Sequence, residues 1–113
     1  MKIYHNPRCK KSRAGLEYLQ EKGVEPEVVK YLKDTTLTEE KLKELLMKLN
    51  EKPQNIIRTQ EKVYKDNFKG KNFTEDEWVK ILVENPRLIQ RPIVESKYKA
   101  VIGNPPQNID DLL

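Results

Sequence analysis

Hydrophobic and polar positions follow two different patterns along the chain, and each pattern predicts a different kind of element. Residues 2–4 and residues 27–32 are short, apolar and rich in β-forming side chains. Between them, Lys10 to Lys22 is a run of helix formers with an apolar stripe, which Gly23 ends. A strand, a helix and a second strand at this spacing predict a parallel strand pair joined by a right-handed crossover.

Residues 35–86 have the periodicity of amphipathic helices. Thr36 and Glu39 have the spacing of an N-terminal capping box, and Thr74 and Glu77 repeat that spacing. Apolar residues on one helical face follow each box: Leu42, Leu45, Leu46 and Leu49 after the first, and Trp78, Ile81 and Leu82 after the second. We therefore predict a helical insertion over about residues 35–86.

Strand character returns at residues 93–94 and 98–102, which are separated by a polar turn at residues 95–97. Such a short connection predicts an antiparallel hairpin, and the tail after Gly103 has room for one brief helix. We thus expect an α/β fold in a single domain over residues 1–113. Its mixed sheet would combine a parallel strand pair with a C-terminal hairpin.

Composition and charge narrow the functional classes. The chain has 113 residues, 35% of them charged, and a net charge of +4, which is weaker than the clustered positive charge typical of nucleic-acid binders. We therefore expect no nucleic-acid partner. No run approaches the roughly 18 apolar residues of a membrane span and no export signal is visible, so we expect a cytoplasmic, monomeric protein.

One cysteine and one histidine limit the possible chemistry. A single cysteine cannot form an intrachain disulfide, and one Cys with one His supplies only two of the four usual ligands of a zinc site. We therefore expect no metal and no bound cofactor. Cys9 is either a small buried hydrophobic residue or a reactive thiol.

The segment HNPRCKKSR, residues 5–13, favours the reactive thiol. The predicted helix places Cys9 at its N-terminus, where unpaired backbone N–H groups and the helix dipole favour a thiolate and bind oxyanions. Four cationic residues lie within four positions of it: Arg8, Lys10, Lys11 and Arg13. Ser12 lies one helical turn on, and His5 is either a polar loop residue or a group that polarises the thiol.

This motif is similar to the H-N-P-x-C-x-x-S-R signature of the glutaredoxin-coupled arsenate reductase family. Further blocks resemble that family in order along the chain: VEPEVVKYL, IIRTQ, ENPRLIQRPIV and VIGNPP. The resemblance implies a thioredoxin-like fold with a helical insertion. It also implies that the cysteine attacks arsenate to form a covalent adduct, which glutathione as co-substrate and glutaredoxin as partner resolve to arsenite.

Carried over by position, Cys9 would be the nucleophile, and His5 and Ser12 would stabilise its thiolate. The oxyanion would be bound by Arg58 and Arg91, whose guanidinium groups suit paired hydrogen bonds to anions. The resemblance also assigns substrate contacts to three further residues, Asn6, Arg13 and Asn104. Pro92 matches the cis-proline position of thioredoxin-like proteins.

Asn104 departs from the family pattern, because the arsenate-reducing members have an arginine in this turn. Two alternatives therefore stay open beside arsenate reduction. The chain could reduce another thiol or disulfide substrate, or it could be a regulator of the related Spx type that binds RNA polymerase. Many Spx proteins carry a C-x-x-C pair, whereas Ser12 occupies the second position here.

Overall fold

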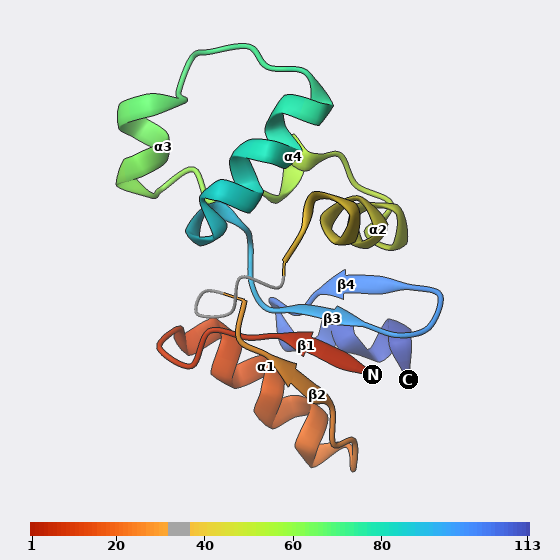
Figure 1. The fold of residues 1–113 in the computed structure, drawn as a ribbon. Helices are drawn as coiled ribbons and strands as arrows, with labels where there is room; N and C mark the ends of the chain where they lie inside the picture. The colour runs from red at the N-terminus through yellow and green to blue at the C-terminus, as the bar shows by residue number, and fades with distance from the viewer. Residues whose placement is uncertain (32–36) are drawn as a thin grey trace. The chain divides into compact units, whose positions relative to one another are not determined.

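The computed structural model describes residues 1–31 and 37–113 of the chain (Figure 1). It contains four short strands: β1 (Lys2–Tyr4), β2 (Glu27–Val29), β3 (Ile93–Glu95) and β4 (Ala100–Ile102). The α-helices are α1 (Lys10–Glu21), α2 (Glu39–Leu49), α3 (Lys62–Asn67) and α4 (Glu75–Glu84). Three 3-10 helices complete the description: η1 (Pro53–Ile56), η2 (Pro86–Leu88) and η3 (Pro106–Leu112).

The strands form one mixed sheet in the order β2-β1-β3-β4. β1 pairs in parallel with β2 and antiparallel with β3, and β4 pairs antiparallel with β3. The predicted parallel pair, C-terminal hairpin and helical insertion are thus confirmed.

The described chain divides into two compact units. The first comprises residues 1–36 and 91–113, and holds the whole sheet with α1 and η3. Its core joins Ile3 of β1, Leu19 of α1, Val94 of β3 and Ile109 of η3, so α1 and η3 pack on the same face of the sheet (Figure 1). The second unit, residues 37–90, contains the remaining helices. The prediction of a single domain stays a prediction.

Close packing against α1 requires a glycine in that helix. A Cβ on Gly15 would lie 2.7 Å from Cγ of Pro92, inside any normal contact distance. Gly103 is also close, because a Cβ built on it would lie 3.1 Å from the same Pro92 atom. These two glycines let α1 and the turn after β4 pack closely against Pro92, the residue before β3.

The second unit is built on the two predicted amphipathic helices. Their apolar faces are buried through Leu42, Leu45 and Leu46 in α2 and Trp78, Val79 and Leu82 in α4. The capping box of Thr74 and Glu77 is present at the start of α4. Trp78 also packs at 4.9 Å, ring centre to ring centre, on Phe73.

Three sequence predictions about element ends are wrong. Thr38, not Thr36, caps α2 by accepting a hydrogen bond from the Lys41 N–H; Thr36 itself lies outside the described residues. β2 ends at Val29, so Tyr31 follows the strand. Glu95 belongs to β3, where its buried side chain accepts a hydrogen bond from Tyr4, whereas Tyr98 lies in the turn and is exposed. The Tyr4–Glu95 hydrogen bond is a tertiary contact that local propensity does not contain, whereas the α2 cap is a local contact between Thr38 and Lys41.

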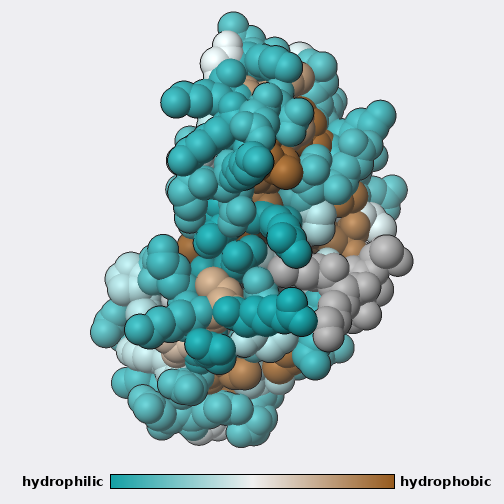
Figure 2. Space-filling view, turned by 90° about the vertical axis from the view of Figure 1, so that its left-hand side faces the viewer, coloured by the Kyte–Doolittle hydropathy of each residue, from teal (hydrophilic) through white to brown (hydrophobic). Residues whose placement is uncertain are grey.

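The face of the molecule in Figure 2 is covered mainly by hydrophilic side chains, with smaller hydrophobic areas between them. No helix in the described part of the chain combines the length and the apolar character that crossing a bilayer requires.

Candidate active site

The sheet register brings four segments of the first unit together at one edge. Tyr4, the last residue of β1, lies between Val29, the last of β2, and Ile93, the first of β3. Ile93 in turn pairs with Ile102, the last residue of β4. The residues that follow β1, β2 and β4, and those that precede β3, therefore meet at this edge. It corresponds to the end of the sheet where the chain leaves β1 for α1 in Figure 1.

Cys9 is the N-cap of α1. Its backbone is extended, with φ −92° and ψ 123°, its carbonyl accepts the first helical hydrogen bond from the Arg13 N–H at 3.0 Å, and its own N–H donates to the carbonyl of Asn6 at 3.0 Å. The residue is neither fully buried nor fully exposed. The prediction that Cys9 lies at a helix start is confirmed, and the residue is partly exposed to solvent.

The surroundings of Cys9 favour its thiolate. Burial by itself raises the pKa of Cys9, but a hydrogen bond from the Arg91 guanidinium and further ones from the backbone N–H groups of Ser12 and Lys11 lower it more. The positive charge of Arg91 acts in the same direction. The net result is a pKa below the ordinary value of a cysteine.

The cation beside the thiol is therefore not one of its sequence neighbours. The side chains of Arg8, Lys10, Lys11 and Arg13 are exposed, and Lys11 contributes through its backbone. Arg13 donates from its guanidinium to the carbonyl of Pro7 at 3.3 Å, which ties down the loop. Arg91, only 8% exposed, supplies the charge from a position that only the sheet brings close.

His5 and Ser12 form a buried pair behind the loop. Ser12 Oγ lies 2.9 Å from His5 Nδ1 and accepts the N–H of Asn6 at 2.9 Å. Because the hydroxyl oxygen already accepts from Asn6, its hydrogen is available to His5 Nδ1, which favours the His5 tautomer protonated at Nε2. The side chain of Ser12 thus organises the loop, while its N–H faces the Cys9 sulfur.

His5 is poised as a neutral side chain. Burial lowers the pKa of His5, an interaction with the backbone of Ser12 opposes this, and the positive charges of Lys30 and Arg13 lower the pKa further. The net pKa lies below the ordinary value, so the ring is uncharged at neutral pH. Its backbone N–H donates to Val29 at 2.8 Å and continues the pairing of β1 with β2.

Arg91 is the centre of a short chain of contacts. Burial alone would lower its pKa, but contacts with Cys9 and with Tyr31 raise it to a net value above that of a free arginine. Tyr31 was missed in the sequence as a site residue, since its β-forming side chain indicated a place in a strand. No signal in the sequence separated it from the strand, because β2 ends at Val29 only in the structure.

Three other predicted residues lie at or beside this edge. Asn6 Oδ1 accepts the N–H of Arg8 at 3.0 Å, which shapes the loop. The Arg91–Pro92 peptide bond is cis, as the resemblance implies for Pro92. Asn104 is exposed and follows Gly103, whose N–H donates to the Pro92 carbonyl at 2.7 Å.

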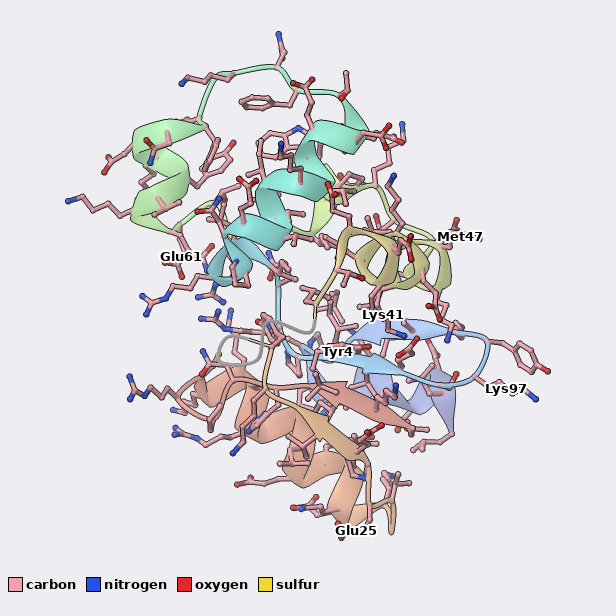
Figure 3. All side chains as sticks on the ribbon, in the orientation of Figure 1. Tyr4, Glu25, Lys41, Met47, Glu61 and Lys97 are labelled. Carbon is pink, nitrogen blue, oxygen red and sulfur yellow. The ribbon has the colours of Figure 1, made fainter. Side chains whose placement is uncertain are left out.

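Arg58 belongs to the second unit. Its Nε donates to Oε1 of Glu61 at 3.2 Å, and its backbone N–H donates to Leu88 at 2.6 Å. Glu61 is labelled in Figure 3 beside the start of α3. The assignment of Arg58 to the oxyanion stays a prediction. Within residues 1–31 and 37–113, no cluster of three or more His, Cys, Asp or Glu side chains is arranged to hold a metal ion.

The profile of the ArsC family matches residues 4–112. This chain belongs to the ArsC family. The Escherichia coli K12 protein YfgD is 42% identical to it, covering all of this chain and 96% of that protein. An arsenate reductase of Neisseria meningitidis serogroup A is 39% identical, covering all of this chain and 97% of the relative.

An arsenate reductase structure from Vibrio cholerae shares the fold of this ArsC-family chain. The two superpose with a TM-score of 0.91 at 37% identity, over all of this chain and 98% of the other. The thioredoxin-like fold that the sequence resemblance implied is therefore confirmed, and so is the family.

Proposed function

We propose that this chain is a thiol-dependent oxidoreductase that reduces arsenate to arsenite, with Cys9 as the nucleophile. One observation carries the proposal: the Cys9 sulfur lies at the start of α1, against the Arg91 guanidinium and two backbone N–H groups. The same donors that favour a thiolate suit a tetrahedral oxyanion, because a helix N-terminus and a guanidinium both bind such groups. Arsenate reductases among the relatives of this chain support this substrate.

The electron count supports a thiol co-substrate. Arsenic passes from the +5 to the +3 state, and two thiols supply the two electrons when they join as a disulfide. The chain contains one cysteine, so the second thiol has to come from another molecule. We propose glutathione for this role and glutaredoxin as the protein that completes the cycle, which places the reaction in the cytosol.

The proposed first step needs no metal. The Cys9 thiolate forms a bond to arsenic, and one arsenate oxygen leaves as water after taking up protons. In this proposal Arg91, which interacts with the Cys9 sulfur in the resting protein, neutralises charge on the remaining oxygens. Glutathione then attacks the adduct, and thiol oxidation to a disulfide accompanies the release of arsenite.

Asn104 favours a second candidate, in which the substrate is another thiol or disulfide. Its exposed amide lies in the turn after β4 and carries no positive charge. A hydrogen bond to a charged group is worth about 1.5–3 kcal/mol, which corresponds to roughly ten- to hundredfold in binding. A disulfide substrate would not need a third positive charge beside Arg58 and Arg91. Cys9 could therefore attack a disulfide although Asn104 is uncharged.

A coupled assay with arsenate, glutathione and glutaredoxin tests the proposal. We expect weak activity from the parent, none from Cys9→Ser, and roughly ten- to hundredfold more from Asn104→Arg. Equal rates for the parent and Cys9→Ser would end the catalytic assignment.

A parallel assay separates the second candidate from the first. A mixed disulfide between glutathione and a small thiol replaces arsenate as substrate. Reduction of the disulfide by the parent, with no arsenate turnover even in Asn104→Arg, would favour the second candidate. RNA polymerase binding with neither activity would favour the regulator alternative.

A further inference from the structure

Tyr31 is a buried tyrosine at the active-site edge that the proposed reaction does not use. Only 4% of its surface is exposed, and it lies in the turn directly after β2. Because β1 and β2 run in parallel and Tyr4 pairs with Val29, this turn lies beside the loop that leads from β1 to Cys9. The register therefore places Tyr31 near the loop that carries Cys9.

The Tyr31 hydroxyl and the Arg91 Nε are both buried atoms. Interaction with Tyr31 raises the pKa of Arg91, and Arg91 in turn lowers the pKa of Cys9. Arg91 is 8% exposed, so water can orient little of its guanidinium. A buried charged group depends on fixed protein partners for its position. Tyr31 offers such a partner on a short, two-torsion side chain, whereas Arg91 has many rotamers to restrict.

We propose that Tyr31 is a positioning residue that holds the Arg91 guanidinium against the Cys9 sulfur. Tyr31 would act through Arg91 and would not itself touch the reacting atoms. The inference rests on the proposed role of Cys9 as a nucleophile, but it does not depend on arsenate as the substrate. Its effect is expected in the resting protein, before any substrate binds.

The test is the rate of Cys9 alkylation by iodoacetamide as a function of pH. We expect Tyr31→Phe, which removes only the hydroxyl, to raise the midpoint of the alkylation-rate profile by about half a unit to one unit. At pH values below the wild-type midpoint, alkylation should then be about three- to tenfold slower. Arsenate is absent, so a failure here is separate from a failure of the proposed function. A wild-type midpoint in folded Tyr31→Phe would overturn the inference.

Tyr4→Phe is the matched control. Tyr4, labelled in Figure 3, is equally buried at 5% exposure. Its hydroxyl, however, donates to Glu95 Oε1 at 3.1 Å. This variant should keep the wild-type alkylation midpoint. An equal shift in both variants would mean that any lost buried hydroxyl loosens the site, which would contradict a specific role of Tyr31.

The Arg91→Met background tests whether the effect passes through Arg91. Arg91→Met alone should raise the midpoint, and adding Tyr31→Phe should change it no further. An undiminished effect of Tyr31→Phe in this background would overturn the inference. Should Tyr31→Phe fail to fold, Tyr31→His serves as the second variant. It should also raise the midpoint, and a folded Tyr31→His with a wild-type midpoint would contradict the proposal.

Discussion

Cys9 depends on donors from two distant parts of the chain. The N–H groups of Lys11 and Ser12 are local, because they belong to the first turn of α1. The guanidinium of Arg91 comes from the segment before β3. Behind the sulfur, Ser12 joins His5 to Asn6 through one hydroxyl, so that the loop and the helix start form one hydrogen-bonded unit.

The lowered pKa of His5 predicts a pH dependence of stability. Since the folded pKa lies below the unfolded value of about 6.5, the unfolded chain binds the proton more readily. The contribution of His5 is therefore complete above about pH 6.5 and decreases as the pH falls below it. His5→Asn keeps a polar group near Ser12 but cannot take up this proton. Urea unfolding at about pH 7.5 and 5.5 should show a smaller loss of stability in His5→Asn than in the wild type.

Other groups that titrate in this range are common to both proteins, so the difference between them isolates His5. An equal loss in wild type and His5→Asn would show that burial of His5 does not affect folding stability at acid pH.

At the scale of elements, α1 contributes both the Cys9 site and a close approach to Pro92. Gly15 and Cys9 lie on the same helix, and the Pro92 ring touches the position where a Gly15 side chain would be. The turn after β4 is fixed to the same residue by the Gly103 hydrogen bond. Gly15 and Gly103, which have no side chains, therefore allow α1 and the turn after β4 to pack closely against Pro92, next to Arg91.

Gly15→Ala should destabilise the protein despite its higher helix propensity. Alanine is intrinsically favoured in helices by about 1 kcal/mol, but its Cβ would lie 2.7 Å from a rigid proline ring. Overpacking of this kind costs about 1–3 kcal/mol, so we expect a net loss measured by urea unfolding. The alkylation midpoint of Cys9 should also rise, because Arg91 precedes the displaced Pro92.

Ala14→Gly is the control for Gly15→Ala on the same helix. It should cost only about 0.5–1 kcal/mol through backbone entropy and leave the alkylation midpoint unchanged. A Gly15→Ala protein more stable than the wild type would show that α1 can shift without loss.

At the scale of the whole molecule, the second unit is inserted between the two chain segments of the first. Each unit has fewer than about 60 residues, a size at which an isolated domain is marginal. If the second unit unfolds, a long flexible loop separates β2 from β3 and adds to the entropy cost of closing the first unit. For both reasons, unfolding of the second unit is expected to destabilise the first.

We therefore expect one unfolding transition for the whole chain. Trp78, the only tryptophan in the sequence, lies in α4 and reports on the second unit by fluorescence. In the first unit, unfolding removes the donors that lower the pKa of Cys9, so the loss of its activated alkylation rate under denaturant reports on that unit. Both should have the same urea midpoint. Two separated midpoints would mean that the units unfold independently, against the single-domain prediction.

The sequence alone identified what depends on neighbouring residues. Hydrophobic spacing predicted α2 and α4, the glycine at position 23 predicted the end of α1, and the motif around Cys9 predicted a thiol at a helix start. It placed the end of β2 and the cap of α2 incorrectly. The length of β2 depends on its pairing with β1, and the cap is Thr38 with Lys41, although Thr36 and Glu39 have the spacing of a capping box. The family resemblance added Arg91 and Pro92 by position.

The tertiary structure decided which charge the thiol meets. The four cationic residues next to Cys9 in the sequence have exposed side chains, and Arg91 instead lowers the pKa of the thiol. Arg91 is brought to this end of the sheet because β1 and β3 run antiparallel with Tyr4 opposite Ile93. Tyr31 reaches the same place through the parallel pairing of β1 and β2. Strand pairing joins residues far apart in sequence, and no local pattern contains that register.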